Sequence, residues 1–511
     1  MDTALGSLIQ SYHSDFAREE GRMLRVSSYS ILSTPLEDGS YALMNGISGA
    51  VDLVPADLGQ SLEKVLANRD QASEFEFLAM LDLETIKSFY ERGHLTSLSE
   101  EEETQQVCAI AEATHEAAAK KPSFLIVPNF DCNYRCTYCF ERPLQNSLYQ
   151  KCGTDVSSSR NIVMSRDQVD AVYRSIISIQ KQVGCSQGGQ IVLYGGEPLD
   201  AQHKSIVTYI ISRGLEEGFC FAAITNGHDL DAYTGLLGPS LIEQIQVTFD
   251  GPKTVHDRRR IHRGHESSFD KIVANIHQVL HETEVQIQLR IHVAPDTLEY
   301  FAELIEFFDR QGWTNHPRVV IYGSTIYAKK QDGKVTSTVP NDLIAQALSS
   351  VAAVYFNVYT CPPAFHTTSA LRPVFADGSR FELRGVYCSA NVGLYVFAPD
   401  GGVYSCWESI GKECSRIGHY DSPEGLVLHK ERANRWFNRS VAAIAECQRC
   451  PYALVCGGGC AQYAEYNTGS LYKPYCDHFQ GVFRQTLAEN LEFFLKTGHS
   501  KMGFVETVVR E

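Results

Sequence analysis

The sequence predicts an α/β protein whose central sheet is parallel. Six short apolar segments rich in β-branched residues alternate with longer segments of helical periodicity between residues 123 and 355. Repeated strand–helix units of this kind build a parallel sheet, because each helix returns the chain to the same edge. The flanking regions differ from this pattern, since the first begins with β-like runs and the last is rich in cysteine and glycine.

These patterns divide the chain into five predicted segments. We expect an N-terminal domain over residues 1–95, an acidic helical linker over 96–122 and the α/β core over 123–360. A cysteine-rich domain follows over 361–480, and a C-terminal helix and tail occupy 481–511. A chain of 511 residues is long enough for several domains with cores of their own.

Two β-like runs and two helical segments are predicted in the N-terminal domain. The runs cover residues 23–32 and 40–54, and helical periodicity follows over 58–70 and 81–95. The linker is rich in alanine and glutamate, so we expect a single connecting helix that ends before Pro122.

In the core, helical periodicity follows most of the predicted strands. The segment 165–183 after the first strand and the segment 298–312 after the fifth both have the period of an amphipathic helix. A last helix is expected over 482–498. The predicted strands are residues 123–128, 190–194, 220–225, 245–249, 285–293 and 318–322.

The charge balance bears on the choice of partner. The formal net charge is −16 and no long run of lysine and arginine accompanies it. This argues against nucleic acid or an anionic membrane surface as the main partner. The one local basic cluster, residues 255–264, is interpreted as a solvated loop.

The N-terminal segment and the cysteine content predict the compartment. The first residues lack the basic and apolar regions of a signal peptide, and no apolar run approaches the ~18 residues of a membrane helix. Sixteen cysteines without an export signal indicate thiols or metal ligands rather than disulfides. We therefore expect a cytoplasmic protein with no membrane partner.

The most informative motif is a group of three cysteines after the first core strand. Cys132, Cys136 and Cys139 stand in the run PNFDCNYRCTYCFE with the spacing C-x3-C-x2-C. Three thiolates can hold three corners of a [4Fe–4S] cube and leave the fourth iron open for chemistry. A zinc site of similar spacing is the main alternative.

With Tyr138 before its last cysteine, this motif resembles the cluster motif of the radical S-adenosylmethionine (SAM) superfamily. The resemblance implies a partial (β/α)6 barrel with the cluster loop after its first strand. It also implies that the open iron binds the amino and carboxylate groups of SAM. By this resemblance, SAM is cleaved to a 5′-deoxyadenosyl radical that abstracts hydrogen from an unactivated C–H bond.

Three further motifs at strand ends strengthen the resemblance. Gly195, Gly196 and Glu197 begin a GGEP sequence after the second strand, where glycines allow close backbone approach and a carboxylate can accept from an ammonium group. This is similar to the GGEP motif that contacts the SAM amino group in the superfamily. By the same resemblance, Thr225-Asn226 is placed near the SAM ribose and Thr248 near the SAM carboxylate. Capping of a strand end is the alternative role of these polar residues.

Seven cysteines in the fourth segment form a second signature. They look like the SPASM signature, which marks a domain that holds auxiliary [4Fe–4S] clusters. The resemblance implies two clusters, whose ligand sets are Cys388, Cys406 and Cys460 for one and Cys447, Cys450, Cys456 and Cys476 for the other.

Two questions about these cysteines stay open. Cys361 or Cys414 could complete the first set, or that iron could be open for substrate. A zinc ribbon over residues 447–460 is the alternative to the second cluster.

The N-terminal domain carries a weaker resemblance. Its order of β-hairpin and helices, with the phrase YALMNGISGAVDLV, is similar to the winged-helix-like leader-binding domains of peptide maturases. Such domains (also called RRE domains) pair a peptide with an exposed strand edge. The alternative is a structural appendage that packs on the core.

These resemblances predict a radical SAM enzyme that modifies a ribosomally synthesised precursor peptide. We expect crosslink formation or backbone rearrangement or excision, such as tyramine splicing. The expected partners are a leader-bearing precursor peptide and a reductant such as flavodoxin or ferredoxin, and a small partner protein is left open.

Three alternatives remain, namely formylglycine formation of the sulfatase-maturase type, peptide epimerisation and a non-enzymatic scaffold. Sulfatase maturases typically have an aspartate directly after the second SPASM cysteine, whereas this chain has Trp407 and then Glu408, the candidate base.

Overall fold

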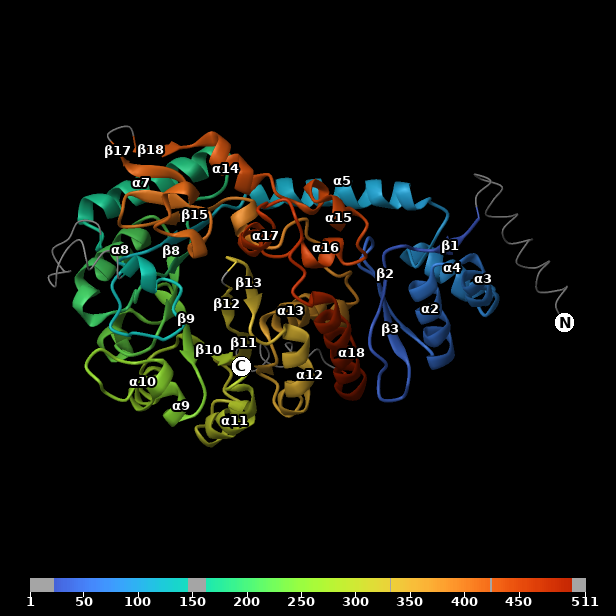
Figure 1. The fold of residues 1–511 in the computed structure, drawn as a ribbon, viewed down its shortest axis with the longest axis horizontal. Helices are drawn as coiled ribbons and strands as arrows, with labels where there is room; N and C mark the ends of the chain where they lie inside the picture. Colours follow the sequence, from blue (N-terminus) through green and yellow to red (C-terminus); the bar gives the residue numbers. More distant parts are fainter. Residues whose placement is uncertain (1–22, 146–161, 331, 423–424, 499–511) are drawn as a thin grey trace.

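A computed structural model describes residues 23–145, 162–330, 332–422 and 425–498. Its largest feature is an eleven-stranded sheet with the order β14-β11-β10-β9-β8-β7-β6-β15-β16-β17-β18. Helices cover this sheet, and the N-terminal domain lies at the opposite end of the molecule from α7 and α8 (Figure 1). The expectation about a signal peptide concerns residues outside the described ranges. Among the described helices, none combines the length and apolar character needed to cross a membrane.

The six predicted core strands are confirmed, and they lie side by side in chain order. Each pairs in parallel with the next, as repeated strand–helix units require. The partial-barrel form of this unit remains a prediction. The strands are β6 (Ser123–Ile126), β7 (Gly189–Leu193), β8 (Phe219–Thr225), β9 (Ile242–Phe249), β10 (Gln286–Val293) and β11 (Val319–Thr325).

The helices between these strands bury one apolar face against the sheet. The predicted helix after the first strand is α7 (Arg166–Val183), which begins with a capping box between Ser165 and Gln168. Buried residues of α7 such as Ile176 belong to the same hydrophobic core as the strands. The other helices between the strands are α8 (Lys204–Glu216), α9 (Lys253–Arg259), α10 (Ser268–Glu282) and α11 (Phe301–Arg310), and α12 (Asn341–Ala352) follows β11.

The cysteine-rich region continues the core sheet and does not build a sheet of its own. Strand β15 (Leu394–Phe397) pairs in parallel with β6, the strand that precedes the first cysteine motif. Three antiparallel strands, β16 (Gly402–Tyr404), β17 (Arg416–Ser422) and β18 (Gly425–Leu428), extend the sheet beyond it. At the other edge, β14 (Val358–Tyr359) pairs with β11.

Several helices that the sequence did not predict lie in the cysteine-rich region. α13 (Pro362–Asp377) packs against the last helix, α18 (Phe479–Thr497), which confirms the predicted C-terminal helix. The others are α14 (Lys430–Phe437), α15 (Ala445–Gln448), α16 (Ala453–Cys456) and α17 (Ala461–Thr468).

The N-terminal domain differs in detail from the prediction. Each predicted β-like run contains two strands, because residues 27–29 and the segment between Asn45 and Val51 form turns. A helix that the sequence did not predict, α3, lies between the two expected ones. The elements are β1 (Arg25–Val26), β2 (Ser30–Leu32), β3 (Tyr41–Asn45), β4 (Val51–Val54), α2 (Ala56–Asn68), α3 (Gln71–Ala79), α4 (Leu83–Arg92) and β5 (Leu95–Thr96).

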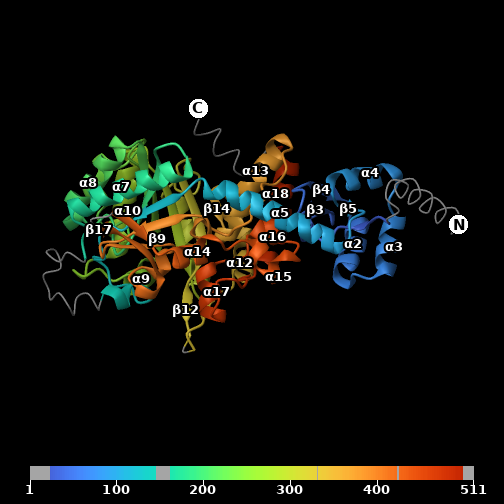
Figure 2. The same cartoon turned by 90° about the horizontal axis from the view of Figure 1, so that it is seen from above.

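The predicted linker helix is α5 (Glu100–Ala119). It connects the N-terminal domain to the core and also packs against the cysteine-rich region. Val107 and Ala111 are fully buried in a core shared with Ile444 and Cys447 of the cysteine-rich region. Figures 1 and 2 show α5 running from the N-terminal domain along the short helices α15 and α16. The sequence did not predict this contact because the acidic residues of the helix suggested a solvated linker.

Candidate functional site

The loop after β6 brings the three cysteines of the first motif together. Cys132 is buried, and Cys136 and Cys139 are half-buried. Burial raises the pKa of each thiol, that of Cys139 to about 12, and the neighbouring cysteines raise the pKa of Cys132 further. The backbone N–H of Tyr134 also donates to the Cys132 sulfur at 3.4 Å. The three sulfurs therefore share one desolvated site.

The GGEP loop after β7 lies directly on the cluster loop. A Cβ atom on Gly196 would lie 2.0 Å from the carbonyl oxygen of Asp131, so only glycine fits. The N–H of Glu197 donates to the same oxygen at 2.7 Å. The structure thus gives Gly196 a role in packing the two loops together, where the sequence suggested close approach to a ligand.

Glu197 is buried at the ends of β7 and β8. Its carboxylate accepts hydrogen bonds from the Thr225 hydroxyl at 2.6 Å, the Asn226 N–H at 2.7 Å and the Leu199 N–H at 2.9 Å. Burial nevertheless raises its pKa to about 7. Since an ionised carboxylate has about four lone-pair sites, these three bonds leave room for one more donor.

Thr225 and Asn226 also link the strand ends to the cluster loop. The Asn226 amide donates to the side-chain oxygen of Asn133, which lies next to Cys132, at 2.6 Å. The Thr225 hydroxyl accepts from the N–H of Gly227 at 3.0 Å. Both residues have structural partners, and their predicted contact with a ribose remains a prediction.

Arg290 on β10 is a site residue that the sequence reasoning missed. Its guanidinium donates from Nε and Nη2 to the hydroxyl of Thr248 on β9, at 3.2 and 3.0 Å. The two residues are register partners in the parallel pair. A forked cation beside a hydroxyl is suited to bind a carboxylate. The signal in the sequence is the polar alternation along β10, because a parallel strand covered on both faces is normally apolar throughout.

The hydroxyl of Tyr138 is the centre of a second group, whose other members the sequence reasoning missed. It donates to the Asp250 carboxylate at 2.8 Å and accepts from the Arg260 guanidinium at 2.9 Å. His292 lies 3.0 Å from the same hydroxyl. Although Asp250 is fully buried, its pKa is lowered by the hydrogen bond with His292 and by the charges of His292 and Arg260.

This arrangement contradicts the interpretation of residues 255–264 as a solvated loop. Arg260 is 7% exposed and His256 is fully buried, while Arg259 pairs with Asp250 at 3.1 Å. Arg259 and Arg260 both have a counter-charge in the buried Asp250, so this segment supports the cluster loop.

The cysteines of the fourth segment lie in two groups. The pKa of Cys447 is raised to about 12 by burial and then by Cys456, Cys450 and Cys476. The pKa of Cys406 is raised by burial and then by Cys460 and Cys388. The groups match the two ligand sets implied above, and their role as metal ligands remains a proposal.

Neither candidate for the remaining ligand of the first set interacts with that set in the described contacts. The Cys361 thiol is buried at the start of α13 and accepts from the Thr360 hydroxyl at 3.8 Å. Cys414 is exposed and contacts the Ser415 hydroxyl. Among the described contacts, neither cysteine is therefore assigned as the fourth ligand of this set.

The turn after Cys406 faces the first cysteine motif. The ring of Trp407 lies 6.0 Å from that of Tyr194, the residue before the GGEP loop. Glu408 is half-buried and accepts from the Tyr463 hydroxyl at 3.3 Å. Burial, and then the charge of Glu408, raise the pKa of Glu141, in the cluster loop, to about 8. The candidate base thus lies between the two cysteine regions.

Two curated proteins are similar to most of this chain. The cysteine-type anaerobic sulfatase-maturating enzyme of Clostridium novyi (strain NT) is 22% identical over 400 residues, which cover 74% of this chain and 98% of the relative. The radical SAM cyclopropyl synthase TigE of Paramaledivibacter caminithermalis is 21% identical over 504 residues, covering 93% and 98%. No protein-family model matches the chain.

The chain is a homologue of radical SAM enzymes. Among solved structures, native anSMEcpe with bound AdoMet shares the fold, with a TM-score of 0.51 and 15% identity over 76% of this chain and 99% of that protein. The same protein has also been solved with AdoMet and the Cp18Cys peptide, with a TM-score of 0.50, 16% identity and coverage of 76% and 99%.

The cysteine groups of this radical SAM homologue are spaced too widely for a single zinc ion. Tetrahedral zinc with Zn–S bonds of ~2.3 Å brings its sulfurs within about 4 Å of one another. In the described ranges, the one group of three potential ligands within 4.8 Å is His228, His262 and Glu266. The rings of these two histidines are stacked, with centroids 4.1 Å apart, so their lone pairs do not converge. The donor set and its spacing fit iron–sulfur cubes better than the zinc alternatives.

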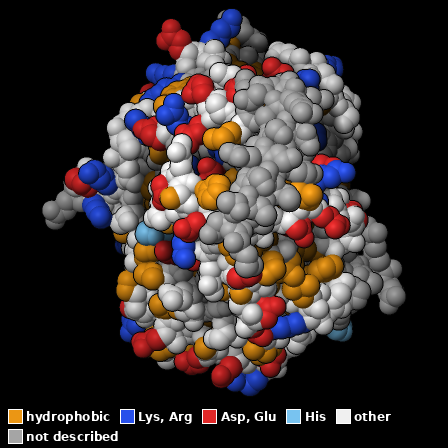
Figure 3. All heavy atoms as spheres, turned by 90° about the vertical axis from the view of Figure 1, so that its right-hand side faces the viewer, with side chains coloured by type: hydrophobic (Ala, Val, Ile, Leu, Met, Phe, Trp, Pro, Cys, Tyr) orange, Lys and Arg blue, Asp and Glu red, His pale blue; other side chains and the backbone are white. Residues whose placement is uncertain are grey.

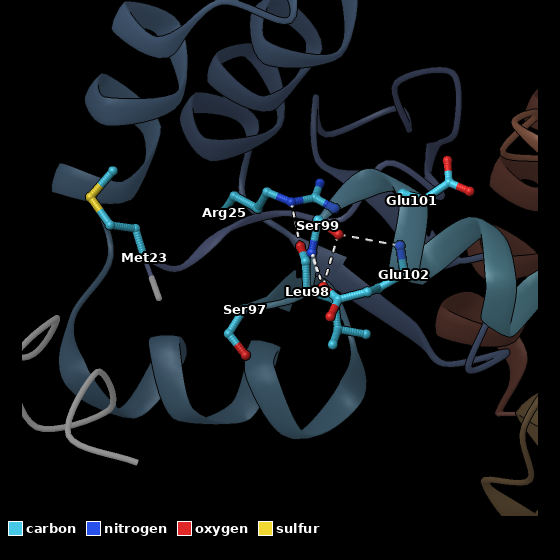
Figure 4. A pocket seen from close by; sticks show the side chains of 7 residues that line it. All are labelled: Met23, Arg25, Ser97, Leu98, Ser99, Glu101 and Glu102. Atoms are coloured by element: carbon cyan, nitrogen blue, oxygen red, sulfur yellow. Dashed lines mark hydrogen bonds between the residues drawn. The ribbon is translucent and has the colours of Figure 1, made fainter. Parts of the chain in front are cut away.

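A hollow of about 620 Å³ lies elsewhere, at the start of α5 (Figure 4). Its polar groups already have partners, since Ser99 and Glu102 form the capping box of α5 and Arg25 donates to the Leu98 carbonyl at 2.7 Å. Those contacts stabilise the junction between the N-terminal domain and α5. The hollow also borders the cysteine-rich region, because Glu101, which lines it, pairs with Arg449 at 3.4 Å.

Proposed function

We propose that the chain is a radical SAM enzyme that modifies a ribosomally synthesised precursor peptide. The observation that carries this proposal is the meeting of the three cysteines of one loop with the buried Glu197 after β7. The Thr248–Arg290 pair lies on the neighbouring strands β9 and β10 of the same sheet. One homologue is a radical SAM enzyme by name, the other is a sulfatase-maturating enzyme, and the solved anSMEcpe structure holds a peptide beside AdoMet.

The cofactors are SAM and [4Fe–4S] clusters. Cys132, Cys136 and Cys139 would hold the SAM-binding cluster, and the two groups of the fourth segment would hold two auxiliary clusters. When bound and reduced, the first cluster and SAM supply hydrogen abstraction from an unactivated C–H bond. A flavodoxin or ferredoxin is the expected reductant.

The residues around the first cluster bind and orient SAM. Glu197 has a free lone-pair site for an ammonium group, and Arg290 with Thr248 can bind a carboxylate. The amino and carboxylate groups of one amino acid would therefore be held by separate strand ends. The buried Tyr138–Asp250–Arg260 group fixes the cluster loop under this site.

The N-terminal domain is proposed to bind the leader of the precursor. Strand β4 is an edge of its three-stranded sheet in the described chain. The backbone groups of Ala42 both face the β2 side, because its C=O accepts from the Ser33 N–H at 2.9 Å and its N–H donates to the Ser33 hydroxyl at 2.9 Å. Its register partner Leu53 therefore directs its N–H and C=O away from β3. A peptide can therefore add as a further strand at Leu53.

The N-terminal domain exposes apolar side chains on this edge strand and on or beside two of its helices. The Leu53 side chain is 48% exposed, and Phe75, Met80 and Leu83 on or beside the neighbouring helices are 56%, 47% and 44% exposed. Figure 3 shows several apolar patches on this end of the molecule. Apolar patches of this kind mark interaction sites.

The proposed reaction changes a bond of the precursor peptide. Crosslink formation and backbone rearrangement or excision are the first candidates, with Glu408 as candidate base because it lies between the two cysteine regions. Formylglycine formation is the second, favoured by the sulfatase-maturating homologue but not by Trp407 directly after Cys406. Peptide epimerisation is retained as an alternative.

The test is to measure iron and acid-labile sulfide after anaerobic reconstitution, and 5′-deoxyadenosine after adding SAM and dithionite. About twelve irons per chain, as three cubes require, are expected together with deoxyadenosine. Replacing Cys132, Cys136 and Cys139 by alanine should remove about four irons and all deoxyadenosine. Cys220→Ser, a half-buried cysteine outside every group, should change neither. Bound zinc without iron or deoxyadenosine would overturn the proposal.

A further inference from the structure

Arg439 is a fully buried arginine that lies between the two cysteine groups of the fourth segment. It follows α14, and its exposed fraction is 0%. Its guanidinium donates only to uncharged oxygens in the described contacts. These acceptors are the carbonyls of Leu471, Gly459 (3.0 Å), Gly458 (2.9 Å) and Lys473 (3.1 Å), and the side-chain oxygen of Asn391 (3.4 Å).

Each acceptor lies in a loop that carries cysteines of one group or of both. Gly458 and Gly459 lie between Cys456 and Cys460, which belong to different groups. Leu471 and Lys473 precede Cys476 of the second group, and Asn391 follows Cys388 of the first. One side chain thus holds together loops from both groups.

The glycine loop is shaped to present its carbonyls to this guanidinium. Gly459 has a φ of +70°, in the left-handed region that favours glycine, and a Cβ atom there would lie 1.8 Å from the Tyr475 carbonyl oxygen. The loop cannot relax outward, because the segment before Cys476 lies against it.

The charge of Arg439 is balanced by the cysteines. No carboxylate forms an ion pair with it among the described residues, although buried arginines are almost always paired. Burial lowers the pKa of Arg439, and Cys388, Cys447, Cys460 and Cys456 oppose this shift. The guanidinium keeps its charge in proteins, so thiolates of both groups would supply the counter-charge once these cysteines hold clusters.

We propose that Arg439 positions the ligand loops of both auxiliary clusters and raises the reduction potentials of both through one shared, buried positive charge. This inference rests on the proposed function, since it requires the two clusters. A cube with thiolate ligands gains one negative charge when it takes up an electron, so a cation inside the protein stabilises the reduced form. Arg439 would thereby adjust both clusters together.

The experiment is a redox titration followed by EPR, in the variant whose Cys132, Cys136 and Cys139 are alanine so that only auxiliary clusters contribute. In this background we compare Arg439 with Arg439→Met and Arg439→Lys. Arg435→Met is the matched control, because Arg435 lies on the preceding helix, is exposed and pairs with Glu465.

For Arg439→Met we expect the reduced fraction at a fixed potential to fall about tenfold, which corresponds to about 59 mV for a one-electron couple. Arg439→Lys keeps the positive charge, so its reduction potentials should stay nearer to those of the parent. The reduction potentials of the control, Arg435→Met, should equal those of the parent. Full iron with unchanged potentials in Arg439→Met would overturn the inference.

If a variant binds less iron than the parent, its iron content is the measurement that tests the inference. Loss of iron from both auxiliary clusters in Arg439→Met and Arg439→Lys supports the positioning role. That role requires the several N–H donors of the planar guanidinium, which lysine lacks. Loss from one cluster alone would overturn the shared role. If the unmutated chain itself holds about four irons, the auxiliary clusters of the proposed function fail, which is a separate and recognisable result.

Discussion

The guanidinium of Arg290 donates to the hydroxyl of Thr248 through two of its nitrogens, Nε at 3.2 Å and Nη2 at 3.0 Å. This contact joins neighbouring strands at the end of the sheet that carries the cluster loop. The proposed function places the carboxylate of SAM at this pair.

Replacing Arg290 by glutamine is therefore expected to weaken SAM binding at least tenfold, since a bond between a charged donor and its partner contributes about 1.5–3 kcal/mol. Equilibrium dialysis of SAM against reconstituted protein measures this. Arg310→Gln, an exposed arginine at the end of α11, serves as the control and should bind normally. An unchanged dissociation constant for Arg290→Gln would remove Arg290 from the site.

Glu197 predicts a pH dependence of the same binding step. Burial raises its pKa to about 7, so the carboxyl is largely protonated at pH 6 and ionised at pH 8. An ammonium group binds the ionised form, so SAM affinity should rise as pH increases through 7 and binding should release a proton. Calorimetry in two buffers of different ionisation enthalpy measures that proton. Glu197→Gln should bind weakly with a flat profile between pH 6 and 8, and a profile like that of the parent would contradict this assignment.

Gly196 predicts a steric effect on the first cluster alone. Gly196→Ala places a Cβ atom 2.0 Å from the Asp131 carbonyl oxygen, a backbone atom that cannot move aside cheaply. Overpacking of this kind costs about 1–3 kcal/mol. We expect loss of up to four irons and of deoxyadenosine formation, while the auxiliary clusters remain. Gly235→Ala is the control, because nothing lies within 4 Å of its Cβ position.

Leu53 predicts how the leader peptide is recognised. Leu53→Pro removes an N–H that points away from β3, and proline is tolerated at such an edge position. We expect the fold to persist and the affinity for a fluorescent leader peptide to fall about tenfold by anisotropy. Leu53→Ala keeps the N–H and should lose less affinity. Equal losses in both variants would indicate that only the side chain matters, and no loss in either would place the leader elsewhere.

Much of the core can be predicted from the sequence, because its strands are apolar, β-branched and separated by periodic helices. The pairing of β15 with β6 cannot, since the four residues Leu394–Phe397 carry no local sign of their distant partner. The burial of α5 was missed for a related reason. Its glutamates suggested solvent, whereas Glu103 is buried and accepts from the Ser27 hydroxyl of the N-terminal domain.

The cysteines of the site can be predicted from spacing, because metal clusters demand several thiolates at short intervals. The polar residues around them were harder to find. Asp250 and Arg260 form an ion pair with the charged atoms 3.8 Å apart, and they come together only when β9 and the following helix fold over the cluster loop. Their signal is charge in positions next to apolar strands, which a solvated loop explains equally well until burial is known.

The packing of α5 also bears on the length of the substrate. A helix of 20 residues spans about 30 Å. α5 packs on both the N-terminal domain and the cysteine-rich region, and these two also touch directly, since the Tyr29 hydroxyl donates to the Gln448 carbonyl. The proposed leader-binding strand is therefore held at a fixed distance from the cysteine groups. An extended peptide advances about 3.3 Å per residue, so about nine residues would cover the length of this helix. Inserting residues between the leader and the modified segment should therefore move the site of modification along the precursor by the same number of positions.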